Sequence, residues 1–256
     1  MRKNTLKEKL NAGKATVGAF VNFPSPAMVE GLGWLGFDFV IIDCEHCPMD
    51  YETAENMIRA AELSDITPVV RIGMNVQQHI QRYMDAGAAG VLIPLINSGA
   101  DARRVVDAVK YPPIGKRGLF AGRGAMFGVQ AVAEYVKQAN EETFVGLQIE
   151  TQEGLDAQDE IIAAEHADLI FLGPGDLSST FGVHGEQRHP KVVQTIRDLT
   201  PKIRAAGKHV GTIAASGEHA REWSDQGVKW LVSSTNRFFM AGSGAYLQEC
   251  REALAG

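Results

Sequence analysis

The sequence lacks several features that would place it in a class at once. No apolar stretch approaches the roughly 20 residues that a membrane-spanning helix needs. The first nine residues contain no apolar core of a signal peptide. Three cysteines are too few for a disulfide framework, so we expect reduced thiols and a cytoplasmic protein. The net charge of −6 argues against a general nucleic-acid binder, which normally has a basic face. No membrane or nucleic-acid partner is therefore expected.

What the sequence does contain is typical of a globular protein with a full core. Hydrophobic residues make up 45% of the chain and charged residues 22%. A length of 256 residues suits one large α/β domain or two small ones. No change of composition marks a linker, so residues 1–256 are predicted to form a single domain.

Apolar, β-branched runs alternate with amphipathic segments along the chain. We expect strands at residues 16–21, 37–42, 68–71, 90–94, 144–149, 168–172, 209–213 and 228–232. We expect helices at residues 3–12, 25–35, 51–63, 76–86, 100–110, 132–139, 153–164, 190–206, 217–226 and 239–254. Eight such βα units predict an α/β protein with a closed (β/α)₈ TIM barrel. The rival, an open doubly wound sheet, normally has a glycine-rich ligand loop after its first strand, and residues 17–23 contain none.

Four predicted strands end in charged residues. They are residues 37–46 (FDFVIIDCEH), 68–71 (PVVR), 145–150 (VGLQIE) and 169–176 (LIFLGPGD). The carboxyl ends of parallel strands meet at one end of a barrel, and α/β folds place their chemistry there. The pattern therefore predicts a single convergent site.

The first two of these strand ends supply an acid/base candidate and a cation. Asp43 near His46 would fix the imidazole tautomer and make a general acid or base. The alternative is that His46 only satisfies a polar strand end. Arg71 ends an apolar strand and must be paired, because an unpaired buried charge is costly. Its partner is either a protein carboxylate or an anionic substrate.

Glu150 and Asp176 follow two neighbouring strands and are candidate metal ligands. Carboxylates at adjacent strand ends suit Mg²⁺ or Mn²⁺, which keep several waters and accept substrate oxygens. The alternative is that Asp176 caps a helix. Residues 173–176 also leave backbone N–H groups free beside a helix start, a receptor for a small carboxylate.

Two further features allow more than one interpretation. Cys44 and Cys47 have the spacing of redox and zinc motifs, but Cys250 stands alone, so the second pair of a structural zinc site is missing. The alternative is two small side chains beside a site.

A long glycine-rich loop after residue 110 is the second feature, since loops of this length are usually functional or mobile. Its basic side chains would either clamp a second anionic group or be solvated; they are Lys116, Arg117 and Arg123.

Taken together, these segments resemble the HpcH/HpaI family of metal-dependent (class II) pyruvate aldolases, over nearly the whole chain and in register. The matching segments are FDFVIID-x-EH at 37–46, PVVR at 68–71, DAG at 85–87, YPP-x-G-x-RG at 111–118, QIET at 148–151 and GPGDLS at 173–178.

The resemblance implies a role for each central residue. Glu150 and Asp176 would bind Mg²⁺, Mn²⁺ or Co²⁺, which chelates the carboxylate and keto oxygen of pyruvate. Arg71 would contact the keto or enolate oxygen. His46, with Asp43 behind it, would form the acid/base dyad.

Further residues are implied to bind substrate. The backbone of Gly175 and Asp176 would hold the pyruvate carboxylate. The other predicted substrate-binding residues are Gln148, Phe20 and Ile213.

The resemblance also implies an oligomer. Asp85 would approach metal-bound water from a neighbouring subunit, and family members assemble as trimers or hexamers that exchange a C-terminal helix. This sequence departs from the family at Cys44 and Cys47, where glycine and a small residue are usual, and at residues 233–239. The aldehyde specificity is therefore less defined than the pyruvate half of the site.

The expected reaction is reversible cleavage of a 4-hydroxy-2-oxo acid to pyruvate and a small polar aldehyde. Cleavage beside a ketone leaves an enolate, whose charge a metal cation and an arginine can stabilise. No lysine ends a predicted strand, so a Schiff-base mechanism has no support. The alternatives are a related lyase, such as an oxaloacetate decarboxylase or a citrate lyase β-like enzyme, and a non-catalytic barrel that binds a keto acid.

Overall fold

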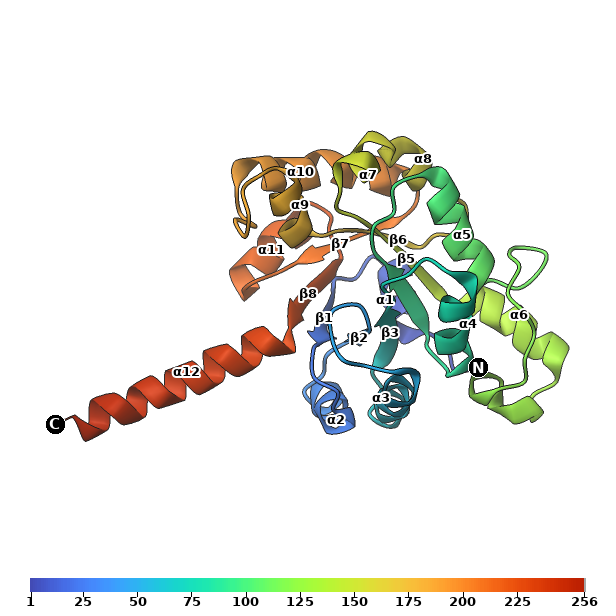
Figure 1. The fold of residues 1–256 in the computed structure, drawn as a ribbon, viewed down its shortest axis with the longest axis horizontal. Coiled ribbons are helices and arrows are strands. Elements are labelled where there is room, and N and C mark those ends of the chain that lie inside the picture. The colour runs from blue at the N-terminus through green and yellow to red at the C-terminus, as the bar shows by residue number, and fades with distance from the viewer. Residues whose placement is uncertain (256) are drawn as a thin grey trace.

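Eight parallel strands pair in sequence order and close on themselves in a computed structural model that describes residues 1–255 (Figure 1). The last strand pairs with the first, with Thr16 opposite Trp230 and Phe20 opposite Ser234. The predicted TIM barrel is therefore confirmed. The strands are β1 (Thr16–Val21), β2 (Phe39–Asp43), β3 (Thr67–Arg71), β4 (Gly90–Ile93), β5 (Phe144–Ile149), β6 (Leu169–Leu172), β7 (His209–Ile213) and β8 (Trp230–Ser234).

Helices surround the barrel, and most lie within two residues of their predicted bounds. The predicted helix at 153–164 is two short helices, and a further helix is present at 174–180. The last helix begins at residue 235 and not at 239, because Ser234 caps it by accepting a hydrogen bond from the backbone N–H of Arg237. The helices are α1 (Thr5–Asn11), α2 (Pro26–Trp34), α3 (Tyr51–Leu63), α4 (Gln77–Asp85), α5 (Gly99–Val109), α6 (Val132–Glu142), α7 (Gln152–Asp156), α8 (Gln158–Ile162), α9 (Pro174–Thr180), α10 (Pro190–Ala205), α11 (Gly217–Asp225) and α12 (Thr235–Leu254), with the 3₁₀ helix η1 (Arg123–Gly128).

Large aromatic side chains fill the inside of the barrel. Phe39 stacks on Trp230, with ring centroids 4.5 Å apart. The rings of Phe39 and Trp230 fit because the neighbouring strands carry glycine at positions 18 and 211. A Cβ at Gly18 would lie 2.3 Å from the Phe39 ring, and a Cβ at Gly211 would lie 2.7 Å from Trp230. The barrel is a packed core and not a pore.

Helix α1 closes the amino end of the barrel. Leu6 and Leu10 are buried in the same cluster as the aromatic residues inside the barrel. The side chain of Asn4 caps α1 and donates to the backbone oxygens of Ala89 and Glu142, which precede β4 and β5. The carboxyl ends of the strands lie at the opposite end of the barrel, where active sites of this fold are built.

Helix α12 extends away from the barrel, in red in Figure 1. Within it only Thr235 is buried among the described residues. The aromatic residues of its first turn contact residues near the barrel: Phe238 packs on Phe37 and Phe239 on Phe23. Across residues 1–255, no helix combines the length and the apolar character needed to cross a membrane.

Candidate active site

Arg71 and Asp43 form a bidentate ion pair at the adjacent ends of β2 and β3. The Nε and Nη2 atoms of Arg71 donate to the two carboxylate oxygens at 2.9 and 2.7 Å. Burial acts to raise the pKa of Asp43, but hydrogen bonding and the charge of Arg71 outweigh it and hold the pKa below its ordinary value. The guanidinium also lies over the Phe20 ring, 4.5 Å from its centroid. Of the two partners expected for Arg71, the structure shows a protein carboxylate.

Asp43 organises the turn that follows β2. Its Oδ1 accepts hydrogen bonds from the backbone N–H groups of Glu45 and His46, at 3.2 and 3.3 Å. Its Oδ2 accepts from the side chains of Asn22 and Cys47, at 3.3 and 3.5 Å. A fully buried carboxylate is thus surrounded by donors on all sides.

The predicted contact between the Asp43 carboxylate and the imidazole of His46 is not present in residues 1–255. Asp43 reaches only the backbone of His46, whose side chain is 63% exposed. The imidazole Nε2 lies instead 3.5 Å from Oε2 of Glu45. The reason is that the donors already on Asp43 leave no free lone pair for the ring.

Glu45 also lies at this site, and the sequence reasoning gave it no role. Its carboxylate also lies 3.3 Å from Nε of Arg71, and its side chain is only 14% exposed. Burial raises the pKa of Glu45 above its ordinary value, against the lowering effect of Arg71 and His46. The signal that pointed to it was its place directly after a buried strand, between Asp43 and His46.

Glu150 and Asp176 lie together at the ends of β5 and β6. Burial and then the negative charge of Asp176 raise the pKa of Glu150 to about 8, although a hydrogen bond from Gln148 acts to lower it. The backbone N–H of Leu95 donates to Glu150 Oε1 at 3.1 Å, from a residue with φ of 54°. Gly173 makes room for this arrangement, because a Cβ there would lie 3.0 Å from Glu150 Oε2.

Asp176 does not cap a helix. Helix α9 begins at Pro174 with Gly173 as its N-cap, so Asp176 is in the first turn, where its side chain is exposed. The space before Gly175 is open, since the nearest atom to a Cβ placed there is Nε2 of Gln187 at 3.7 Å. Within residues 1–255 no group of three or more His, Cys, Asp or Glu side chains is arranged to hold a metal ion. A metal here would therefore have two protein carboxylates.

Two apolar side chains lie at this end of the barrel. Phe20, at the end of β1, is 6% exposed and packs edge-on against Phe171. Ile213 ends β7, is partly buried and packs against the same cluster inside the barrel.

The cysteines beside the site are protonated thiols. Burial raises the pKa of Cys44 to about 12, and burial also raises the pKa of Cys47. A thiol must ionise before it binds a metal or acts as a nucleophile. Cys47 serves here as a hydrogen-bond donor to Asp43.

The basic residues of the glycine-rich loop do not reach this site within one chain. Each of them is paired with a carboxylate: Arg117 with Asp85 at 2.6 Å, Arg123 with Glu62 at 2.5 Å and Lys116 with Asp107 at 2.7 Å. Among the described residues of one chain, these side chains therefore form no anion clamp at the candidate site. The predicted approach of Asp85 to a neighbouring subunit stays a prediction.

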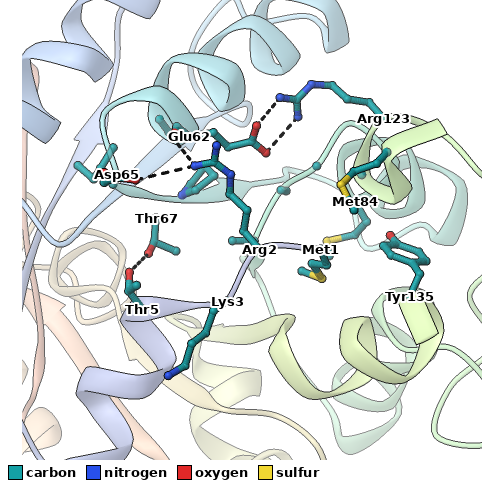
Figure 2. Close-up of a pocket in the computed structure, with 18 of the residues that line it drawn as sticks. Met1, Arg2, Lys3, Thr5, Glu62, Asp65, Thr67, Met84, Arg123 and Tyr135 are labelled. Carbon is teal, nitrogen blue, oxygen red and sulfur yellow. Dashed lines mark hydrogen bonds and ion pairs between the residues drawn. The ribbon is translucent and has the colours of Figure 1, made fainter. Parts of the chain in front are cut away.

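Figure 2 shows where Arg123 lies. Arg123 and Arg117 line a cavity of about 660 Å³, together with Thr67 and Ala89 at the beginnings of β3 and β4. In the figure Arg123 reaches Glu62, and Arg2 reaches Asp65. This cavity opens at the amino end of the barrel, opposite to Arg71 and Glu150, and is not the candidate active site.

The sequence profile described as HpcH/HpaI aldolase/citrate lyase matches residues 16–234. The chain belongs to this family. It is 33% identical over 252 residues to the hydroxypyruvate/pyruvate aldolase of Roseovarius nubinhibens, covering 98% of this chain and 96% of that one. It is 36% identical over 242 residues to the 5-keto-4-deoxy-D-glucarate aldolase of Salmonella arizonae, covering 94% of each.

Solved structures agree with this assignment. An HpcH/HpaI family protein from Burkholderia cenocepacia superposes with a TM-score of 0.91 at 29% identity, over 97% of this chain and 100% of that one. A Mycobacterium tuberculosis protein, described in complex with magnesium and acetate, has a TM-score of 0.56 at 19% identity, over 87% and 86%, and shows the fold alone. The family member described here is a class II pyruvate aldolase, a lyase. Aldolases of this class depend on a divalent metal ion.

Proposed function

We propose that this aldolase reversibly cleaves a 4-hydroxy-2-oxo acid to pyruvate and a small polar aldehyde. The observation that carries the proposal is that two carboxyl groups and a paired arginine lie at the same end of the barrel. Glu150 and Asp176 place two carboxyl groups together there, and Arg71 is a cation held in place by Asp43. An anionic pair suits a metal ion, and a fixed guanidinium suits the oxygen of an enolate.

Glu150 and Asp176 fit a divalent metal by their chemistry. The buried Glu150 carboxylate lies beside a second negative charge, an arrangement that a cation would stabilise. Two carboxylates also suit Mg²⁺, Mn²⁺ or Co²⁺, which fill their other positions with water and substrate oxygens. A metal bound by these residues would supply Lewis-acid polarisation of a keto oxygen.

Side chains of the protein carry out proton transfer and stabilise the enolate. In the cleavage direction the C4 hydroxyl proton passes to the imidazole of His46, and the C4–O bond becomes a carbonyl. The electron pair of the C3–C4 bond moves into the pyruvate half as an enolate. Arg71 stabilises the negative oxygen of that enolate, because Asp43 holds its guanidinium in one orientation before the charge develops.

The choice of aldehyde rests on the relatives. One of them is named for 5-keto-4-deoxy-D-glucarate, a substrate that carries hydroxyl and carboxyl groups outside its pyruvate half. The loop arginines, which would have supported an anionic aldehyde, are paired at the other end of the barrel. Two solved structures named for citrate lyase are 17% and 19% identical to this chain, so they support a shared fold and not a citrate lyase activity.

A panel of aldehydes tests the substrate class. With pyruvate and Mn²⁺, we expect kcat/KM to be at least about tenfold higher for hydroxy- or carboxy-aldehydes than for an alkyl aldehyde of equal length, a difference of roughly 1.4 kcal/mol. Product formation is measured by chromatography, and oxaloacetate decarboxylation is measured in parallel. Equal rates with alkyl aldehydes, or a higher kcat/KM for oxaloacetate, would contradict the proposal.

We further propose that the protein is a homo-oligomer, a trimer or hexamer that exchanges α12 between subunits. The helix exposes large apolar side chains along its length, among them Met240, Tyr246 and Leu247 at 68%, 70% and 49% exposure. An exposed apolar helix of this kind marks an interaction surface.

Leu247→Asp is therefore expected to dissociate the oligomer, because the new carboxylate would be buried in the subunit contact. The neighbouring variant Gln248→Asp adds the same charge at a polar position of α12 and should leave the mass unchanged. Light scattering on a sizing column measures the mass. A wild-type mass of one chain, or the same mass for both variants, would contradict the exchange.

A further inference from the structure

The imidazole of His46 has a carboxylate beside it, and it is not the one expected. His46 Nε2 lies 3.5 Å from Glu45 Oε2, whereas Asp43 reaches only the His46 backbone. We propose that Glu45 is the positioning residue that holds the imidazole of His46 with Nε2 protonated and so leaves Nδ1 as the base. The inference deepens the proposed function and rests on it for the role of His46.

Asp43 cannot take this role because its lone pairs are already used. A carboxylate has about four lone-pair sites. Arg71 occupies two of them with bonds of 2.9 and 2.7 Å, and four further donors share the rest. Rotating Asp43 toward the ring would break the buried pair with Arg71 and leave a buried charge without its partner.

Glu45 has the free capacity that Asp43 lacks. Its Oε2 is buried and has no hydrogen-bond partner among the described residues. A buried carboxylate oxygen without a donor is unusual, and a donor that reaches it gains a charge-assisted hydrogen bond. The ring of His46 is 63% exposed and free to rotate, so a small turn brings Nε2–H into hydrogen-bond range of Oε2. Such bonds often tighten only when substrate is present.

The position of Glu45 is itself fixed by the neighbouring loop. A Cβ at Gly73 would lie 3.3 Å from Cγ of Glu45 and 3.4 Å from its Cα, so the segment after β3 packs directly against this side chain. Nε of Arg71 lies 3.3 Å from the same oxygen on the barrel side, an ion-pair contact without hydrogen-bond geometry, because this N–H donates to Asp43. Glu45 is thus confined between Arg71 and Gly73.

The charges around Glu45 determine what it does for His46. Those that act on it are Arg71 from β3, Asp43 from β2, Asp176 from α9 and His46 itself. Arg71 is already matched by Asp43, so the negative charge of Glu45 is left to stabilise an imidazolium. When His46 takes the C4 hydroxyl proton on Nδ1, the positive charge forms next to Glu45 Oε2.

The experiment is an NMR titration of His46 in the full-length, Mg²⁺-saturated protein. The protein is labelled with ¹⁵N-histidine, and His46→Gln identifies the His46 signal. In Glu45→Gln, which keeps the shape and removes the charge, we expect the imidazole to lose its preference for the Nε2–H tautomer. Its titration midpoint should fall by roughly half a pH unit or more, because an adjacent anion favours the charged ring. The acid limb of the pH profile of kcat/KM should move by the same amount.

Asp43→Asn is the matched comparison. It also removes one carboxylate from the same turn, but it is expected to move the His46 midpoint by less than Glu45→Gln does. An unchanged midpoint and tautomer in Glu45→Gln, or an equal or larger shift in Asp43→Asn, would overturn the inference. The titration needs no turnover, so it separates the two proposals. A shifted midpoint in a protein without aldolase activity would contradict only the proposed reaction.

Discussion

Arg71→Ala is expected to lower the exchange of pyruvate methyl protons in D₂O by about a hundredfold or more, in protein saturated with Mn²⁺ or Mg²⁺. Exchange requires the enolate of pyruvate, and in the proposed mechanism the guanidinium of Arg71 stabilises the oxygen on which that charge develops. Removing one preorganised donor from such an oxygen typically costs about 10²–10³ in rate. The residual signal is followed by ¹H NMR after the metal has been replaced in chelator-stripped protein.

The variant needs a control for folding, because it leaves Asp43 buried without its partner. A double variant, Arg71→Met with Asp43→Asn, removes both charges and should regain stability while staying as inactive as Arg71→Ala. Arg197→Ala removes an arginine from an exposed pair with Glu222 and should exchange at the wild-type rate. If folded Arg71→Ala exchanged pyruvate methyl protons at the wild-type rate, Arg71 would not stabilise the enolate. If the wild-type protein bound metal and pyruvate but exchanged no methyl protons, the proposed enolate mechanism would be wrong.

The residues at the strand ends could be predicted from the sequence because the barrel leaves little choice about where they go. Asp43, Arg71 and Glu150 each follow a run of apolar residues buried on both faces, and parallel strands bring their carboxyl ends together. Once eight βα units are recognised, these side chains must lie at the same end. The prediction needed no knowledge of side-chain contacts.

Within one chain the loop arginines lie away from the site, for a reason that the same topology explains. Arg117 and Arg123 come after α5 and before β5, so they belong to an αβ connection at the amino end of the barrel. Active sites of this fold are built from the opposite βα loops. The position of these residues after a helix was the signal that could have excluded them.

The pairing within the turn after β2 could not be read from the sequence. Asp43, Glu45 and His46 are three residues of one turn, and spacing alone allows either carboxylate to face the ring. The choice is made by Arg71, which comes from another strand and takes up both oxygens of Asp43. A tertiary contact therefore decides which carboxylate is left for His46.

Glu150→Gln is expected to abolish metal-dependent activity by removing half of the anionic pair that would hold the metal. The amide keeps the size of the side chain and its hydrogen bond from the Leu95 N–H, so the fold should be preserved. Without the charge, affinity for Mn²⁺ should fall by on the order of a hundredfold or more, since even residues that only support a metal ligand are worth about 10–100-fold. Calorimetry with Mn²⁺ on chelator-stripped protein measures this directly.

Two comparison variants make the result specific to the ion. Asp176→Asn removes the other carboxylate and should weaken Mn²⁺ binding to a similar degree, because each anion alone leaves too little charge to hold the ion. Glu153→Gln removes an exposed carboxylate three residues after Glu150 and should bind Mn²⁺ as the wild type does. If Glu150→Gln kept wild-type affinity for Mn²⁺, the ion would be bound elsewhere. The raised pKa of Glu150, about 8, would then reflect only its burial beside Asp176.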